Sequence, residues 1–396
     1  MIFHAGQLKY VKFFKKGCEM RYCKKCVQPD TRPSIVFDDD GICAACRYQE
    51  GIPRIDWNER KRQLQEIAAW AKKTSKGGFD CVVGVSGGKD SHVQALYVKE
   101  QLGLRALLVN CAPDGITDVG RQNLENLVQQ GFDMVSFRLN PKVCRAVARR
   151  AFFEYGNPVK PSEYPLYAVS YHTALRFKIP LVVQGENAAI TLGVLSDLNA
   201  DGNALNVNQY HTLAGGNASD WVEAGIEPGD LLFYQFPDKN ELRKKVRAIF
   251  LGYYLKEWSY GGNIDLSVGR GLRGRPGHDP NMTGRLSPFS SIDSDMQIVN
   301  QMLKYYKLGF GFVTDEVCYY IREGKLSRDE AIELVERYDG ECDERYVREF
   351  CDYIGIAVDE FWLVVDRFVN KELFSRDRSI GKWVPRFKVG IGLLAD

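Results

Sequence analysis

The residues best suited to chemistry form the hexapeptide SGGKDS, residues 86–91, directly after the apolar run FDCVVGV. A glycine-rich turn between a strand and a helix directs several backbone N–H groups to one point, and the helix dipole favours negative charge there. The two glycines lack a Cβ, so a phosphate can touch the main chain. The two serines offer hydroxyl groups, and Lys89 offers a positive charge. The hexapeptide therefore predicts a phosphate-binding loop.

Asp90 within this loop has two interpretations. It suits the N-cap of the following helix, and it also suits a contact to Mg²⁺ that accompanies the phosphates. The spacing differs from a Walker A loop, which has four residues between its first glycine and the GK pair and a Ser or Thr after the lysine. It differs equally from the GxGxxG pattern of dinucleotide-binding folds.

Four cysteines are spaced as metal ligands. CKKC at 23–26 and CAAC at 43–46 are two CxxC pairs separated by residues 27–42. This spacing predicts a zinc site formed by Cys23, Cys26, Cys43 and Cys46. Because four thiolates close the coordination shell, the zinc is expected to be structural. The alternatives are an iron–sulfur cluster, which four thiolates also hold, and free thiols.

The composition is that of an ordinary globular enzyme. The chain has 396 residues, of which 45% are hydrophobic and 26% charged, and its net charge is +2. This charge lacks the basic excess typical of strong nucleic-acid binding, although a local basic patch remains open. We predict no membrane span and no signal peptide, since the sequence shows neither pattern. The odd count of eleven cysteines argues against a disulfide framework and indicates a reducing cytoplasm.

Buried strands alternate with helices from residue 79 onward. We predict strands at 79–85, 104–112, 132–139 and 179–187, with helices at 89–103, 118–131, 141–156 and about 165–178. This alternation predicts an α/β fold, a parallel sheet with helices on both faces. Asp56 and Glu59 resemble a capping box at the start of an earlier helix over 56–73. A further helix is predicted near 239–252.

Five segments are predicted along the chain. They are an N-terminal extension, a four-cysteine module, an ATP-binding α/β domain, a Gly/Arg-rich loop region and a helical C-terminal region, at residues 1–19, 20–55, 56–255, 256–292 and 293–396. In the last segment Ser327 and Glu330 form a capping box, and Thr314 and Asp343 are predicted N-caps.

The hexapeptide is similar to the SGGxDS pyrophosphate loop of the PP-loop ATP pyrophosphatase families, and all six positions match. This resemblance implies a PP-loop, or adenine nucleotide alpha hydrolase-like, fold. Together with CVQPDTRP and DDDGICAAC, the loop resembles the N-acetyl sugar amidotransferase family of the WbpG and PseA type, which serves O-antigen (lipopolysaccharide) and flagellin-sugar biosynthesis. QGENAAI, NELRKKVRAIFLGYYLKEW and GFGFVTDEVCYYIREGKLSRDEAIELVERYDG are similar to segments of that family. The resemblance extends from Met20 to about residue 370.

The resemblance implies an ATP-dependent, AMP-forming amidotransferase acting on a diacetamido sugar that is linked to a nucleotide or related to such a sugar. ATP would adenylylate an acetamido oxygen, and ammonia would displace AMP and leave an acetamidino group. A cysteine-centred glutaminase with a histidine partner is not recognisable in this sequence. Ammonia must then come from elsewhere, and the resemblance implies a HisH-like glutaminase and a HisF-like cyclase as the partners that supply it.

Candidate residues fall into three groups. The predicted catalytic residues are Lys89, Asp90 and Glu186. Glu186 is expected to hold Mg²⁺ or orient ammonia, with a helix cap as the alternative. The predicted ATP site comprises Ser86, Gly87, Gly88, Lys89, Asp90, Ser91, Val109 and Asn110, the last two because related folds place adenine near the end of the second strand. Predicted substrate contacts are Asn187, Lys160, Arg270 and Arg273, with Asp114 and Arg275 as further candidates and no role assigned to His172 or His278.

Two other functions remain open. A tRNA-thiolating enzyme also joins a PP-loop to cysteine knuckles and adenylylates a base carbonyl. The near-neutral charge and the lack of a CxxC pair after residue 46 count against it, whereas Cys111, just after the second strand, keeps it open. The second alternative is a non-catalytic zinc-knuckle scaffold, which the intact SGGKDS loop disfavours.

Overall fold

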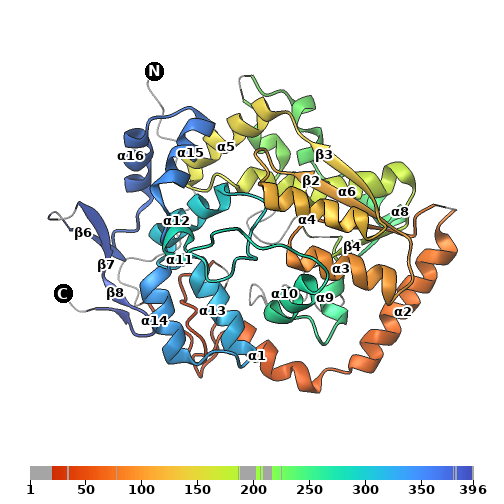
Figure 1. Ribbon diagram of the computed structural model, residues 1–396, viewed down its shortest axis with the longest axis horizontal. Coiled ribbons are helices and arrows are strands. Elements are labelled where there is room, and N and C mark those ends of the chain that lie inside the picture. Colours follow the sequence, from red (N-terminus) through yellow and green to blue (C-terminus); the bar gives the residue numbers. More distant parts are fainter. Residues whose placement is uncertain are drawn as a thin grey trace.

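The chain forms two lobes side by side along its long axis (Figure 1). The computed structural model describes residues 20–33, 35–76, 78–185, 187, 202–205, 207, 216–223, 225–377, 379 and 381–394. A sheet flanked by helices makes up one lobe, and the C-terminal helices make up the other. In the part of the chain that the structure describes, no helix combines the length and the apolar character needed to cross a membrane.

A five-stranded parallel sheet with the order β3-β2-β1-β4-β5 organises the first lobe. Its strands are β1 (Cys81–Gly84), β2 (Ala106–Ala112), β3 (Asp133–Arg138), β4 (Leu181–Gln184) and β5 (Arg247–Phe250). Cys81 is paired with Ala106 on one side and with Leu181 on the other. The predicted parallel α/β fold is confirmed.

The fifth strand corrects the helix predicted near 239–252. The helix α8 (Lys239–Lys245) ends early, and the next residues form β5. The tetrapeptide RAIF is too short to show a strand period, and it becomes a strand because its backbone pairs with β4.

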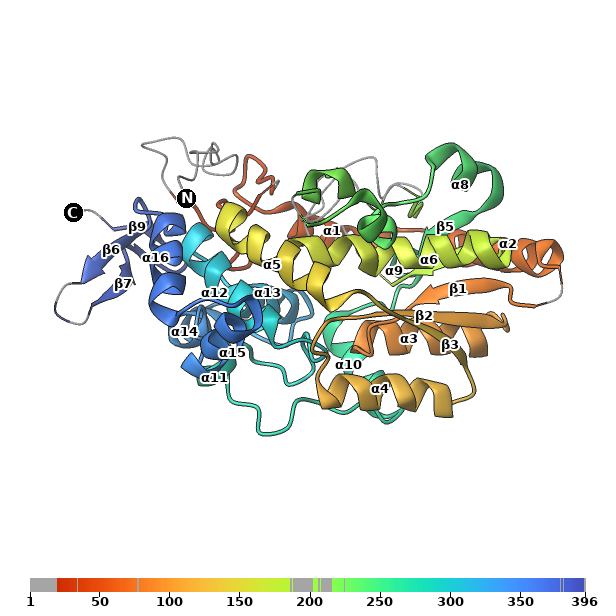
Figure 2. The same cartoon turned by 90° about the horizontal axis from the view of Figure 1, so that it is seen from above.

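Helices cover both faces of the sheet (Figure 2). The helices α2 (Trp57–Thr74), α3 (Lys89–Glu100) and α4 (Asp118–Gln129) share a core with Val83 and Leu108. On the opposite face, α5 (Pro141–Tyr155) and α6 (Glu163–Phe177) share a core with Val82 and Leu107. Neighbouring strand residues thus point to opposite layers, as the two-residue period of a strand requires.

The second lobe is built on five helices within the region predicted to be helical. They are α12 (Met296–Leu308), α13 (Phe312–Arg322), α14 (Arg328–Tyr338), α15 (Glu344–Ile354) and α16 (Val358–Phe368). The predicted capping box of Ser327 with Glu330 and the N-cap at Asp343 are confirmed. The N-cap predicted at Thr314 is wrong, because α13 begins two residues earlier and the Thr314 hydroxyl donates to Asp339.

The C-terminal region is less helical than predicted. After α16 the chain forms two antiparallel ribbons, β6 (Phe374–Asp377) with β7 (Lys382–Pro385) and β8 (Phe387–Lys388) with β9 (Gly392–Leu393). Gly381, directly before β7, and Gly390, between β8 and β9, have positive φ angles that allow the chain to reverse.

The cysteine module and the C-terminal lobe form one structural unit. The helix α1 (Ala44–Gly51), with the four cysteines, Met20 and Tyr22, packs into the same core as α12 to α16, and Phe152 of α5 joins this core. The predicted module at 20–55 therefore does not fold around a core of its own.

The Gly/Arg-rich segment contains a helix that the sequence did not predict. Ser259 caps α10 (Tyr260–Val268) by accepting from the Gly262 N–H. Gly261 lies close to α13, where a Cβ would approach the ends of the Lys325 and Glu323 side chains. The remaining short elements are α9 (Leu251–Tyr254), α11 (Pro280–Thr283) and the 3-10 turns Ile52–Arg54, Lys160–Ser162, Ala218–Trp221 and Pro228–Tyr234.

Candidate functional site

The SGGKDS loop lies at the point where the strand order reverses. The chain passes from β1 to β2 and β3 on one side of the sheet and then to β4 and β5 on the other. In open α/β sheets, ligands bind outside the carboxyl ends of the strands at such a switch point. The loop joins β1 to the N-terminus of α3, so its backbone N–H groups have the position that an anion site requires.

The conformation of the loop depends on its glycines and serines. Gly87 has a φ of +86°, and a Cβ there would lie 3.0 Å from the carbonyl oxygen of Gly120 in α4. The Gly88 N–H donates to Ser86 Oγ at 3.3 Å, and Ser91 Oγ donates to the Gly88 carbonyl at 2.8 Å. The loop therefore packs closely against α4 and is braced by its own hydroxyl groups.

Lys89 and Asp90 form an ion pair at the start of α3. Lys89 Nζ lies 2.5 Å from an Asp90 carboxylate oxygen; the Lys89 side chain is 10% exposed and that of Asp90 is 46% exposed. Gly88, not Asp90, occupies the N-cap position, so the N-cap interpretation of Asp90 is wrong. The contact of Asp90 to Mg²⁺ stays a prediction. Nearby, His92 Nδ1 lies 3.1 Å from the Gly88 carbonyl oxygen, and burial lowers the pKa of this histidine.

Three residues of α10 contact this ion pair. Asn263 Nδ2 donates to Asp90 Oδ1 at 2.7 Å, and Ser267 Oγ donates to the Lys89 carbonyl at 2.8 Å. The ring of Tyr260 lies 4.4 Å from Lys89 Nζ. Sequence reasoning missed these residues. Their spacing of three and four after a Ser cap is a helical signal that the surrounding glycines obscured.

Glu316 of α13 is a buried carboxylate that accepts several hydrogen bonds, one of them from α10. It has no exposed surface, and its carboxylate accepts from the Tyr260 hydroxyl at 2.7 Å and from Ser290 Oγ at 2.7 Å. It also accepts the backbone N–H of Leu286 at 2.7 Å and of Ser287 at 3.2 Å. Burial raises the pKa of Glu316, while the hydrogen bond from Tyr260 opposes the rise.

The four predicted cysteines come together in a buried cluster. All four sulfur atoms lie within 4.8 Å of one another, with Cys23 and Cys46 at 4.0 Å and Cys26 and Cys43 at 3.7 Å. Four sulfurs bound at about 2.3 Å to one tetrahedral ion stand about 3.8 Å apart. Backbone N–H groups of Lys25 and Cys43 approach Cys23 Sγ at 3.4 and 3.3 Å. The donor set therefore fits a single thiolate-bound metal ion.

α13 also borders the cysteine cluster. The Cys318 thiol is within hydrogen-bonding reach of Cys26. One turn later, Arg322 packs beside the cluster, and its Nε has no partner among the described residues. Four thiolates around a divalent ion would leave a net negative charge, which the Arg322 guanidinium would partly offset.

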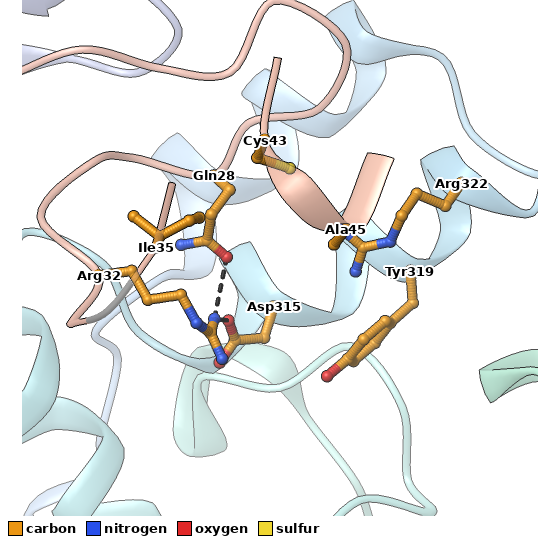
Figure 3. Close-up of a pocket in the computed structure, with 8 residues that line it drawn as sticks. All are labelled: Gln28, Arg32, Ile35, Cys43, Ala45, Asp315, Tyr319 and Arg322. Atoms are coloured by element: carbon orange, nitrogen blue, oxygen red, sulfur yellow. Dashed lines mark hydrogen bonds and ion pairs between the residues drawn. The ribbon is translucent and has the colours of Figure 1, made fainter. Parts of the chain in front are cut away.

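A cavity of about 10 Å³ separates the cysteine module from α13 (Figure 3). Asp315 accepts there from Arg32 at 2.5 Å and, from outside the view, from Lys304 at 2.7 Å. A space of this size holds at most one water molecule. The lining consists of Gln28, Arg32, Ile35, Cys43, Ala45, Asp315, Tyr319 and Arg322. This cavity is therefore part of a structural seam and is too small for a substrate.

The residues predicted for adenine have structural contacts. Val109 is buried in the core under α5 and α6. Asn110 is fully buried; its Nδ2 donates to the Val85 carbonyl at 2.8 Å and its Oδ1 accepts from Ser136 at 3.1 Å. Asn110 therefore ties β2 to β3 and to the residue just before the loop, and it has no amide group facing an open site.

The predicted substrate residues are dispersed. Glu186 lies outside the described residues. Asn187 Nδ2 donates to the Tyr48 hydroxyl at 3.2 Å and to the Gly252 carbonyl at 3.0 Å, which joins α1 to the sheet. Lys160 is buried near Lys307, whose pKa burial and the Lys160 charge lower to about 8.

The predicted arginines lie along α3 and α4. Arg270 pairs with Glu100, the last residue of α3, so its head group lies about 16 Å from the loop by the rise of the helix. The Arg273 guanidinium contacts Gln122, while Asn123 holds the Arg273 backbone in both directions. The structure does not bring the Arg270 guanidinium to the loop, whereas Arg273 is held by Asn123, which lies beside Gly87 of the loop.

The further candidates also have partners. Arg275 pairs with Asp295, and Asp114 contacts the Tyr353 hydroxyl. His172 Nε2 lies 2.8 Å from the Gln235 carbonyl, and His278 Nε2 lies 3.2 Å from the Leu286 carbonyl. Both histidines therefore have the structural contacts expected of residues without an assigned role.

Two polar groups at the switch point were also missed. Gln184 Nε2 at the end of β4 and Ser170 Oγ of α6 are buried and have no partner in the described ranges. Both approach Gly84, the last residue of β1, where a Cβ would lie 3.1 Å from Ser170 Oγ. Buried polar groups without partners are uncommon, so this pair is a candidate ligand contact beside the last residue of β1.

The structure places the SGGKDS loop at the switch point of a parallel α/β sheet, which is the arrangement that the resemblance to PP-loop proteins implies. Residues 283–388 match a family described as "LPS biosynthesis protein WbpG-like, C-terminal domain". The match confirms the predicted resemblance to the WbpG and PseA type, and it covers the helices α12 to α16.

Other comparisons add little. The solved structure of the U34-tRNA thiolase NcsA from Methanococcus maripaludis with its 4Fe-4S cluster is 16% identical, with a TM-score of 0.32. That similarity covers 80% of this chain and 88% of that chain. A likeness this distant bears on neither the substrate nor the metal of the present chain. No curated protein sequence matches significantly.

Proposed function

We propose that the chain is an ATP-dependent, AMP-forming amidotransferase that converts an acetamido group of a diacetamido sugar, nucleotide-linked or related, into an acetamidino group. The phosphate-binding loop at the switch point carries the proposal, because its N–H groups and Lys89 suit the pyrophosphate of ATP. The WbpG-like match supports lipopolysaccharide (O-antigen) biosynthesis and hence a sugar substrate.

The proposed reaction has two steps. The acetamido oxygen attacks the α-phosphorus of ATP and pyrophosphate leaves, which produces an O-adenylyl imidate. Ammonia then adds to the imidate carbon, the carbon–oxygen bond breaks, and AMP leaves with the former amide oxygen. An amide oxygen is a poor leaving group, and its transfer to AMP removes this barrier.

The residues of the loop have separate roles in this proposal. The loop N–H groups and Lys89 stabilise the negative charge that develops on the leaving pyrophosphate. Asp90 would hold Mg²⁺, whose charge would further neutralise the phosphates. The Gln184 and Ser170 side chains would contact the acetamido group, because Gln184 Nε2 and Ser170 Oγ have no hydrogen-bond partner among the described residues.

The cysteine cluster is proposed to hold one structural zinc ion. The sulfur separations of 3.7 and 4.0 Å support a single ion. In a four-iron cluster each thiolate binds a different iron, which sets the sulfurs farther apart. Ammonia would come from a HisH-like glutaminase with a HisF-like cyclase, and Glu186 is proposed to hold Mg²⁺ or orient ammonia.

Product analysis tests the proposal. Purified protein receives ATP, Mg²⁺, ammonium and a UDP-linked diacetamido uronate whose acetamido oxygens carry a heavy isotope. The expected result by mass spectrometry is exchange of one oxygen for NH in the sugar and transfer of the heavy oxygen to AMP. Asp90→Asn and Ser86→Ala should abolish both products, whereas Leu266→Ser, on the exposed side of α10, should keep them.

Two results would count against the proposal. AMP that carries no heavy oxygen, or ADP as the nucleotide product, would exclude adenylylation of the acetamido oxygen. AMP formed from ATP only when tRNA and a sulfur donor are present would instead assign the chain to tRNA thiolation.

A further inference from the structure

We propose that Tyr260 positions Lys89 of the phosphate-binding loop, and that the C-terminal lobe holds Tyr260 through helix α13. This inference rests on the proposed function, because it treats Lys89 as a contact to the phosphates of ATP. Tyr260 would not touch the nucleotide itself, and its effect would pass through Lys89. It is therefore a positioning residue.

The Lys89 side chain is enclosed on two sides. Its ammonium group lies between the Asp90 carboxylate, at 2.5 Å, and the Tyr260 ring, at 4.4 Å. An ammonium group over an aromatic face is attracted by the ring quadrupole, more strongly where water is excluded. Asn263 fixes the other oxygen of Asp90, and Ser267 fixes the Lys89 carbonyl. The helix α10 thus fixes the positions of the Lys89 backbone, of its ammonium group and of the Asp90 counter-ion.

α13 in turn holds Tyr260. The Tyr260 hydroxyl donates to the buried carboxylate of Glu316 at 2.7 Å. The Tyr260 ring stacks on Tyr319, with ring centroids 4.9 Å apart and planes 18° apart. The Tyr320 ring meets it edge-on at 5.5 Å. Glu316 has little freedom to move, because it also accepts two backbone N–H groups and Ser290 Oγ.

A further contact joins the two helices at the first turn of α10. The Gly261 N–H donates to the Glu323 carboxylate at 3.1 and 3.2 Å, and this N–H is one of those that a helix leaves without an internal partner. α13 lies within the WbpG-like match at 283–388, whereas Lys89 lies in the sheet lobe. The proposal therefore gives the C-terminal lobe a specific task, which is to hold α10 against the loop.

Binding of MgATP and of magnesium pyrophosphate by isothermal titration calorimetry tests this inference without a sugar substrate. The variants are Tyr260→Leu, Tyr260→Phe, Lys89→Met, the double variant Tyr260→Leu/Lys89→Met, and Leu266→Ser as a control on the same helix. Tyr260→Leu should weaken binding about tenfold, because Lys89 loses its aromatic contact. Tyr260→Phe keeps the ring and should stay within about threefold of the wild type.

The double variant separates positioning from a general structural role. If Tyr260 acts through Lys89, the double variant binds no more weakly than Lys89→Met alone. Losses that add, or wild-type affinity in Tyr260→Leu, would overturn the inference. Circular dichroism and urea unfolding check that each variant folds. If Tyr260→Leu does not fold, Tyr260→Met, which also removes the ring, replaces it in the single and the double variant.

The outcome for the wild type separates this inference from the proposed function. If the wild type binds MgATP but yields no acetamidino product, the proposed function is contradicted. The binding affinities of the variants still test the role of Tyr260. If the wild type binds neither MgATP nor pyrophosphate, both proposals fall.

Discussion

Replacing Asp315 by Asn should strongly destabilise the protein, because Asp315 is the shared counter-ion of two largely buried cations. Its carboxylate accepts from Arg32 of the cysteine module and from Lys304 of α12, and the three side chains are 10%, 15% and 21% exposed. Removing one partner of a buried ion pair leaves uncompensated charge and costs about 3–5 kcal/mol. Here one substitution removes the counter-ion of both Arg32 and Lys304, so we expect a loss of stability in the upper part of this range. Such a loss is a large share of the ~5–15 kcal/mol that stabilises a typical domain.

Urea unfolding followed by circular dichroism measures this loss. Arg348→Gln is the matched control, because Arg348 forms an exposed pair with Glu344 on the surface of α15. Exposed helical pairs contribute about 0.3–0.5 kcal/mol. If Asp315→Asn costs no more than Arg348→Gln, the argument that this seam depends on buried charge is refuted.

The pH dependence provides a second readout for Asp315. Burial by itself would raise the pKa of Asp315, but the charges of Lys304 and Arg32 outweigh burial and lower it. The folded protein therefore binds the proton less readily than the unfolded chain, so the stabilisation is complete above the ordinary Asp value and is lost as pH falls through the lowered pKa. The stability gap between wild type and Asp315→Asn should stay constant from about pH 7 to pH 5 and narrow below about pH 4. A gap that narrows already near neutral pH would contradict the lowered pKa.

Three further predictions follow from the site and its surroundings. Burial and the Lys160 charge lower the pKa of Lys307 to about 8. Below that pH the buried Lys307 charge destabilises the folded state, and this cost falls as pH rises toward 10. Between pH 7 and pH 10, urea unfolding should therefore show the wild type gaining at most about 3 kcal/mol of stability relative to Lys307→Met. Elemental analysis should find one zinc ion per chain, and chelation of that ion should lower the unfolding midpoint, whereas four irons per chain would contradict the single-ion geometry. Gly87→Ala should cost about 1–2 kcal/mol and abolish detectable MgATP binding in calorimetry, because of its positive φ and the nearby Gly120 carbonyl; Gly78→Ala, where a Cβ meets nothing within 4 Å, should bind as the wild type does.

Short-range patterns in the sequence were enough to predict the frame of the site. Apolar runs alternating with amphipathic segments predicted four of the five strands and the helices between them. The SGGKDS loop lies at the predicted strand-to-helix turn, and the four cysteines of the two CxxC pairs meet. The capping box at Ser327 and the cap at Asp343 also form as predicted. Each of these features depends on residues within a few positions of one another, or on ligand spacing within one short module.

Other features of the site could not be predicted because they depend on partners far along the chain. RAIF is a strand because β4 offers it a backbone ladder, and α10 is a helix against α3 and α13 in spite of its glycines. Arg270 and Arg273 have the charge expected of substrate contacts, yet packing along α3 and α4 turns them to other partners.

The sequence by itself therefore determined the class of fold, the position of the SGGKDS loop and the meeting of the four cysteines, because local geometry and residue chemistry suffice for each. Only the tertiary structure decided what surrounds them. Arg32 contacts Asp315, and Lys89 contacts Tyr260, although each pair is far apart in the sequence and no helical or strand period relates its members. The physical reason is that burial selects these contacts: a charge or hydroxyl removed from water must find a partner, and which partner is within reach depends on how the two lobes pack together.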